Sequence, residues 1–188
     1  MTGRRTPHIP QRRPVYVGCE GTSEVGYAGL LQDMLRDVDL PVHLVVEELG
    51  PGAGDPLARI EMAVSRLLHL GRTRTEPAQR FALLDSDQAL GDPQRADRAR
   101  RVAADNNILI VWQHTCFEAV LLRHLQNCAT RQPPDTLEAG RALKREWPDY
   151  RKPMPRAALS RRIDRAAVLR AAAVEPELET FLRCLGLI

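Results

Sequence analysis

Two short apolar runs in this sequence each stop at a carboxylate. Residues 15–19 are followed by Glu20, and residues 81–84 are followed by Asp85 and Asp87. In an open α/β sheet, the carboxyl ends of the strands line the crevice where ligands bind. Three carboxylates that meet there form the hard, oxygen-rich kind of site that Mg²⁺ prefers. The two signatures therefore predict metal-assisted chemistry on phosphates.

The spacing of the three carboxylates suggests which of them would bind the metal ion and which would act as a base. Asp85 and Asp87 are two positions apart, so on a continuing strand both side chains would project to one side and could share one Mg²⁺ or Mn²⁺ ion. Glu20, from a neighbouring strand, would complete the metal site or act as general base on an attacking water. The competing interpretation is that each acidic residue only caps the helix that follows its strand.

Composition narrows the class of protein. The 188 residues are 44% hydrophobic, enough for one sizeable core with a helical appendage. The net charge of +3 permits a nucleic-acid partner without requiring one. We expect no membrane contact, because no apolar run approaches the length of a transmembrane helix and no secretory signal precedes the first strand. The four cysteines lack zinc-ligand spacing and are typical of free thiols in a reducing cytoplasm.

Strand and helix signals alternate along residues 14–130, after a predicted flexible basic tail at residues 1–13. Strands are expected at residues 15–18, 42–49, 80–84 and 107–112. Helices are expected after a cap at Thr22 or Ser23, from Asp55-Pro56, over residues 93–105, and after a cap at Thr115. This alternation predicts βαβ units and a mainly parallel sheet. In the segment 131–188 the strand signal disappears, and helices are expected at residues 136–147, 156–173 and 176–186.

Several of these residues stand in motifs that resemble those of the RloB-like family. The opening motif is Cys19-Glu20-Gly21-Thr22-Ser23-Glu24, with Tyr27 three positions later. Later motifs are Asp85-Ser86-Asp87, then Thr115-Cys116-Phe117-Glu118 with His124, and finally Tyr150-Arg151-Lys152. The resemblance covers residues 14–152. The family is related to the TOPRIM superfamily, whose pattern is a Glu after the first strand and an Asp-x-Asp after a later one.

The resemblance implies a TOPRIM-like α/β fold in which Glu20, Asp85 and Asp87 are the metal and acid–base residues. It also implies that Glu118 and His124 are family-specific additions to the catalytic site. Proteins of this family occur in prokaryotic defence loci, commonly beside an ABC- or AAA-type ATPase, and are regarded as nucleases of abortive-infection responses. This chain has Gln113-His114-Thr115 where the family often has Ser-Asn-Pro.

Glu118 and His124 also have simpler interpretations. Glu118 lies three positions after Thr115, which is the spacing of a capping box at a helix start. His124 lies six positions after Glu118, so the two would not share a helix face. A histidine in an apolar helix is more often a core residue than a ligand.

Basic residues near the C-terminus are the candidates for contact with nucleic acid. They are Lys152, Arg161, Arg162 and Arg165. On one continuous helix Arg161 and Arg165 would be neighbours on a single basic face, which phosphate binding needs. The competing interpretation is a solvated helix face that contacts a partner protein. The Gly-rich loop at residues 50–54 is not followed by Lys-Ser/Thr and is therefore not a Walker A motif.

The leading hypothesis is a Mg²⁺- or Mn²⁺-dependent phosphodiesterase acting on DNA or RNA. The alternative is a non-catalytic TOPRIM-like subunit that regulates an ATPase-containing defence complex. A nucleotide-binding enzyme of another α/β class is a weaker third reading, because no GxGxxG or Walker signature is present. The oligomeric state does not follow from the sequence.

Overall fold

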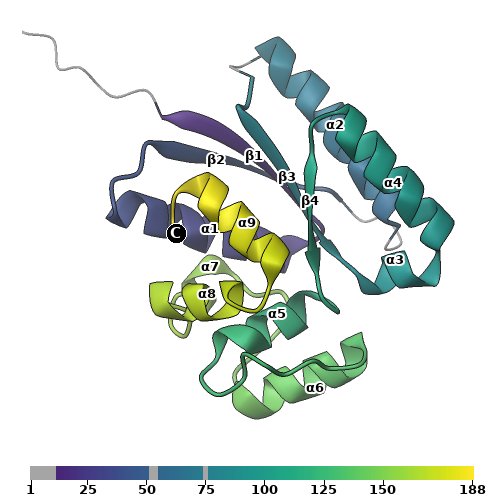
Figure 1. Ribbon diagram of the computed structural model, residues 1–188. Coiled ribbons are helices and arrows are strands. Elements are labelled where there is room, and N and C mark those ends of the chain that lie inside the picture. Colours follow the sequence, from purple (N-terminus) through teal and green to yellow (C-terminus); the bar gives the residue numbers. More distant parts are fainter. Residues whose placement is uncertain (1–11, 51–54, 74–75) are drawn as a thin grey trace, which may run out of the picture.

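The computed structural model describes residues 12–50, 55–73 and 76–188 (Figure 1). The predicted basic tail, up to residue 11, and residues 51–54 of the Gly-rich loop lie outside the described residues. The four strands are β1 (Arg13–Cys19), β2 (Val42–Glu48), β3 (Gln79–Asp85) and β4 (Leu109–Gln113). Each of the four predicted strands is thereby confirmed.

The four strands form one sheet in the order β2-β1-β3-β4, and every pair of neighbours is parallel. The prediction of an α/β fold with a mainly parallel sheet is confirmed, and the fold is of the Rossmann-like class. From β1 the chain passes to β2 on one side and then crosses to β3 on the other. The switch in strand order therefore lies between β1 and β3, which end at Cys19 and Asp85.

Helices make up most of the rest of the described chain. They are α1 (Thr22–Asp37), α2 (Pro56–Thr73), α3 (Asp87–Gly91), α4 (Pro93–Asp105), α5 (Phe117–His124), α6 (Thr136–Glu146), α7 (Arg156–Leu159), α8 (Arg165–Ala172) and α9 (Pro176–Leu185). Within the described ranges, none of these helices combines the length and the apolar character that crossing a membrane requires.

The sheet is covered by helices on both faces, because successive strand residues point to opposite sides. Tyr16 and Leu84 pack into a core with α2 and α4, which Figure 1 shows together on one side of the sheet. Val17 and Leu83, the sequence neighbours of Tyr16 and Leu84, point to the other face and pack into a larger core with α1, α5, α8 and α9. Residues 131–188 contribute to this second core, and the ring of Phe181 in α9 lies 4.7 Å from that of Phe81 in β3.

The prediction of one helix over residues 156–173 is wrong. The segment forms α7 and α8 with a turn between them, where Ile163 is buried and the Asp164 carboxylate accepts the Ala167 N–H at 2.8 Å as an N-cap. Arg161 lies in this turn and Arg165 begins α8, so the two are not neighbours on one helix face. The break arises because burying Ile163 and capping α8 use the residues that would continue α7.

Two predicted N-caps are also corrected. Helix α1 is capped by Gly21, not by Thr22 or Ser23, and the Ser23 hydroxyl instead accepts the Met154 N–H at 3.0 Å. Helix α5 is capped by Cys116, while the Thr115 hydroxyl donates to the Pro133 carbonyl at 3.0 Å. In both cases the side chain serves a contact with a distant segment.

Candidate active site

Glu20 and Asp85 meet at the carboxyl edge of the sheet, where the strand order switches. The Glu20 N–H donates to the Leu83 carbonyl at 3.2 Å, which continues the pairing of β1 with β3. The Glu20 Oε2 accepts the Asp85 N–H at 2.9 Å. This is the place in an open parallel sheet where ligands bind. The structure therefore brings together the two carboxylates that end these adjacent strands.

Asp85 also fixes the start of α5. Its Oδ1 accepts the Phe117 N–H at 2.8 Å, in the first turn of that helix. A carboxylate is favoured there, because unpaired N–H groups carry partial positive charge. The other oxygen, Oδ2, has no hydrogen-bond partner in the part of the chain that the structure describes.

Asp87 does not lie on the strand, because the strand geometry does not continue past Asp85. Ser86 is already in a helical conformation and Asp87 is the first residue of α3. The Asp87 carboxylate accepts its neighbour Gln88 N–H at 2.7 Å and the Thr136 hydroxyl, at the start of α6, also at 2.7 Å. The shared projection of Asp85 and Asp87 was expected only for a strand that continues past Asp85, and the structure does not meet that condition.

Glu118 joins the group from the first turn of α5. It does not form a capping box with Thr115. Its Oε1 accepts the Tyr150 hydroxyl at 3.0 Å and the Lys152 ammonium at 2.6 Å. Its Oε2 is buried and has no hydrogen-bond partner among the described residues. Glu118 thus presents one satisfied oxygen and one unsatisfied buried oxygen.

Glu24, in the first turn of α1, is a further member of this carboxylate cluster and was not among the predicted site residues. The residue is buried. Burial, and then the negative charges of Glu20 and Glu118, raise its pKa to about 7. The available signal was its place four positions after Glu20, which is one helical turn along the chain.

The five carboxylates repel one another, and the effect is largest at Asp85. Burial, followed by the charges of Glu20, Glu24, Glu118 and Asp87, raises the pKa of Asp85 to about 9. Burial also raises the pKa of Glu20. At Glu118 burial acts in the same direction, but the hydrogen bond and charge of Lys152 outweigh it and lower the pKa. Ionisation of all five carboxylates together is therefore unfavourable in this cluster, and a bound cation would favour their charged forms.

The donor atoms fit a cation that takes few protein ligands. Among the described residues, no three His, Cys, Asp or Glu side chains are arranged so that they could hold a metal ion together. The expected group of three ligands is thus not formed. Glu20 and Asp85 each keep one oxygen beyond their backbone contacts, and Mg²⁺ usually binds one or two carboxylates and completes its shell with water and phosphate oxygens.

His124 lies in the core and not among the carboxylates. It is fully buried, with Nε2 2.9 Å from the Tyr27 hydroxyl and Nδ1 2.8 Å from the Val120 carbonyl. Burial lowers its pKa to about 4. Since a neutral imidazole has one donor and one acceptor, Nδ1 carries the proton and Nε2 accepts from Tyr27. This is the position of a satisfied core histidine.

The predicted nucleic-acid residues are separated in the structure. Lys152 lies at the carboxylate cluster, whereas the arginines lie at and beyond the turn after α7. Arg162 donates to the Glu146 carbonyl at 2.8 Å and its guanidinium is 5.7 Å from the centre of the Trp147 ring. Arg165 donates to the Leu187 carbonyl at 2.9 Å, and Arg161 is exposed. Arg162 and Arg165 therefore serve contacts within the fold.

Comparison of the chain with protein-family models, with curated proteins and with solved structures found no match. The resemblance to the RloB-like family rests on the motifs quoted above.

Proposed function

We propose that this protein is a Mg²⁺- or Mn²⁺-dependent phosphodiesterase of TOPRIM type that hydrolyses nucleic acid. The observation that supports the proposal most is the contact between Glu20 and Asp85 across the switch point of a parallel sheet. Two carboxylates from the adjacent strands β1 and β3 at that point, with an unsatisfied Glu118 oxygen beside them, suit a hard divalent cation.

Each side chain of the cluster has a part in this proposal. Glu20 and Asp85 hold the ion, which when bound would polarise a phosphoryl oxygen and acidify a water molecule. Glu24, with a pKa near neutrality, is suited to accept a proton during the reaction. The Lys152 side chain is 60% exposed while its ammonium contacts Glu118, so it can reach a substrate phosphate from a fixed position.

The biological setting is proposed on the resemblance alone. The RloB-like motifs favour a role in prokaryotic anti-phage defence, in the cytoplasm, beside an ABC- or AAA-type ATPase. One observation favours the alternative, a non-catalytic regulatory subunit. Glu20, Asp85 and Asp87 each accept hydrogen bonds from the protein itself, as residues with only a structural role would.

Calorimetric titration of Mg²⁺ and Mn²⁺ tests the metal site. We expect binding by the wild type and none by Asp85→Asn, which keeps the shape of the side chain but cannot lose a proton to become an anionic ligand. Asp97→Asn is the matched control, because Asp97 is exposed and paired with Arg100 at 2.7 Å, away from the cluster. Binding that persists in Asp85→Asn would contradict the proposed ligand set.

Hydrolysis of labelled single-stranded DNA, duplex DNA and RNA then tests the activity. Glu20→Gln and Asp85→Asn should each abolish it while the circular dichroism spectrum stays that of the wild type. Full activity in both variants would contradict the proposal. Absence of cation binding and of hydrolysis in the wild type, with its folding intact, would favour the regulatory subunit.

A further inference from the structure

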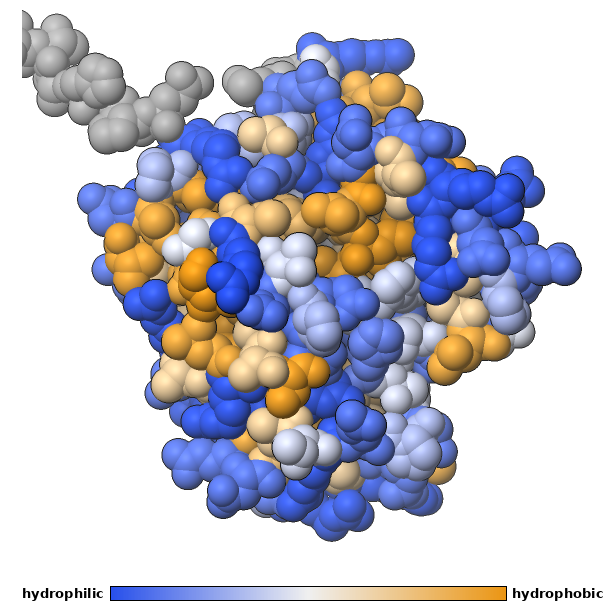
Figure 2. All heavy atoms as spheres, in the orientation of Figure 1, coloured by the Kyte–Doolittle hydropathy of each residue, from blue (hydrophilic) through white to orange (hydrophobic). Residues whose placement is uncertain are grey.

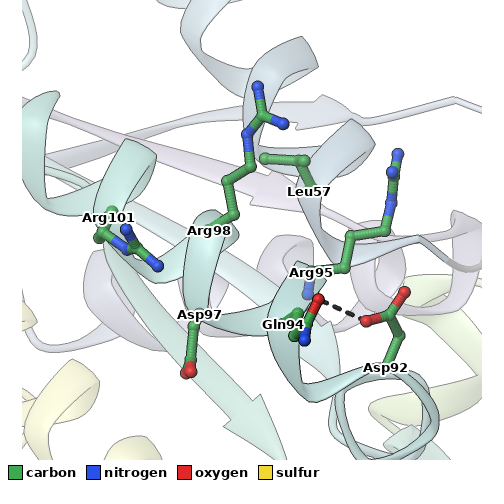
Figure 3. A pocket seen from close by; sticks show the side chains of 7 residues that line it. All are labelled: Leu57, Asp92, Gln94, Arg95, Asp97, Arg98 and Arg101. Carbon is green, nitrogen blue, oxygen red and sulfur yellow. Dashed lines mark hydrogen bonds between the residues drawn. The ribbon is translucent and has the colours of Figure 1, made fainter.

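A depression of about 550 Å³ lies on the helical layer formed by α2 and α4. It runs along the N-terminal half of α4 and against Leu57 of α2 (Figure 3). Three arginines line it: Arg95, Arg98 and Arg101. They are spaced three apart, so they follow one side of the helix. No motif in the sequence marks any of the three.

The acidic residues around this depression already have partners. Asp92 accepts the Arg95 N–H at 3.0 Å as the N-cap of α4, and Asp97 pairs with Arg100 at 2.7 Å. Asp55 forms an ion pair with Arg95, whose Nε donates to the Asp55 Oδ2 at 2.6 Å.

Among the described residues, Arg98 and Arg101 are cations without a partner. Both are exposed, and neither makes a hydrogen bond or ion pair with any residue in the described ranges. Figure 3 shows the Arg98 side chain extending away from the helix beside Leu57. Two unpaired guanidinium groups one turn apart form a surface for anionic groups, because a guanidinium matches the geometry of phosphate oxygens.

This surface begins close to the carboxylate cluster. Asp87 starts α3, which ends at Gly91, and α4 starts at Pro93. A five-residue helix spans about 8 Å, so one short helix separates Asp87 from the start of α4. Figure 1 shows α3 leading from the end of β3 directly to α4. A chain of phosphates lying at the cluster could therefore continue past α3 onto α4.

We propose that Arg98 and Arg101 bind the phosphate backbone of the nucleic acid whose reacting phosphate lies at Glu20 and Asp85. The identity of this ligand rests on the proposed function. Such contacts hold the polymer in register and read no bases. The arginines at residues 161–165 are poorer candidates, because Arg162 and Arg165 are bound to backbone carbonyls.

The test measures binding without catalysis. Short fluorescein-labelled oligonucleotides (single-stranded DNA, duplex DNA and single-stranded RNA) are titrated by fluorescence anisotropy in EDTA over a range of salt concentrations. The variant is Arg98→Gln/Arg101→Gln. The charge-matched control is Arg161→Gln/Arg162→Gln, and thermal unfolding verifies that both variants fold.

We expect the variant to bind more weakly for every sequence of a given polymer. Loss of two phosphate contacts should make the slope of log K against log salt about 1.4 less steep for a single strand. If the variant and the wild type bind equally at about 1 M salt, this change in slope makes the affinity of the variant roughly 25-fold lower at about 0.1 M salt. The control should keep the wild-type slope. The polymer with the largest loss identifies the ligand.

Three results would overturn the inference: an unchanged slope in Arg98→Gln/Arg101→Gln, an equal loss in the control, or no binding by the wild type to any of the three polymers. Failure of the proposed function gives a different pattern. In that case the arginine-dependent binding remains, and no hydrolysis follows when Mg²⁺ or Mn²⁺ is added.

Discussion

Single hydrogen bonds distinguish two buried tyrosines that look alike in the sequence. The Tyr27 hydroxyl lies 2.9 Å from His124 Nε2, whereas the Tyr16 hydroxyl is buried with no partner among the described residues. Removing one partner of a buried hydrogen bond leaves the other unsatisfied, which costs about 1–3 kcal/mol, while removing an unpartnered hydroxyl costs nothing of this kind.

We therefore expect Tyr27→Phe to lower the free energy of unfolding by about 1–3 kcal/mol and Tyr16→Phe to leave it unchanged or raise it. Urea denaturation near pH 7 measures both. The pKa of His124 is lower in the folded state, at about 4, than in the unfolded chain, where it has its ordinary value. The stability that neutral His124 contributes is therefore present at neutral pH and is lost as the pH falls below that ordinary value toward about 4. Equal losses in the two variants would contradict the assigned hydrogen bond.

Among the site residues, some positions were predictable from the sequence and some contacts were not. Glu20 and Asp85 follow apolar runs of four or five residues, and the run lengths were enough to place both at strand ends. The partner of Glu118 was not predictable in this way, because Lys152 is 34 positions further along the chain.

At the scale of elements, the segment before α7 packs directly against α1. A Cβ atom on Gly26 would lie 2.3 Å from the Met154 carbonyl oxygen, so only glycine fits there. The Ser23 hydroxyl, one turn earlier, accepts the Met154 N–H. These contacts place Lys152, two residues before Met154, over the carboxylate cluster.

Gly26→Ala should therefore destabilise the protein by about 1–3 kcal/mol, the range for forcing an extra carbon into a packed interior. It should also weaken the contact of Lys152 with Glu118. Gly140→Ala, in α6, is the matched control, because nothing lies within 4 Å of its added carbon, and it should stabilise by about 0.5–1 kcal/mol. Thermal and urea unfolding measure both changes. A neutral Gly26→Ala would show that the segment does not pack as described.

At the scale of the whole molecule, a buried ion pair connects the C-terminal segment to the sheet. Arg123 in α5 binds Glu175, which caps α9, and the two side chains are only 6% and 4% exposed. Arg123 also donates to the carbonyls of His114, just past β4, and of Arg131. The pair therefore joins α5, α9 and the end of β4.

Removing one charge leaves the other buried without a partner, so Arg123→Met or Glu175→Gln should each cost about 3–5 kcal/mol. The double variant Arg123→Met/Glu175→Gln should cost less than the sum of the two. Arg141→Gln is the control, since Arg141 and Glu138 are an exposed pair, and it should cost less than about 1 kcal/mol. Chemical denaturation of the four variants gives the coupling. Additive losses would contradict the pairing.

Figure 2 shows an apolar area over the region of β4, which lies at an edge of the sheet. Edge strand β4 exposes Leu109, and the region around Ile110 and Trp112 is partly buried. This arrangement follows from the strand order, because β4 has a neighbour on one side only.

The sequence by itself determined the alternation of strands and helices and the position of Glu20 and Asp85 at strand ends. Both follow from apolar runs and turn residues that are local in the chain, and parallel strands necessarily bring their carboxyl ends to one edge. Only the tertiary structure decided that Asp87 starts α3 and binds Thr136, that residues 160–164 interrupt a helix, and that Lys152 reaches Glu118. It also decided that Arg98 and Arg101 find no partner among the described residues. The contacts of Asp87 with Thr136 and of Lys152 with Glu118 join residues far apart in the chain, for which no local pattern exists.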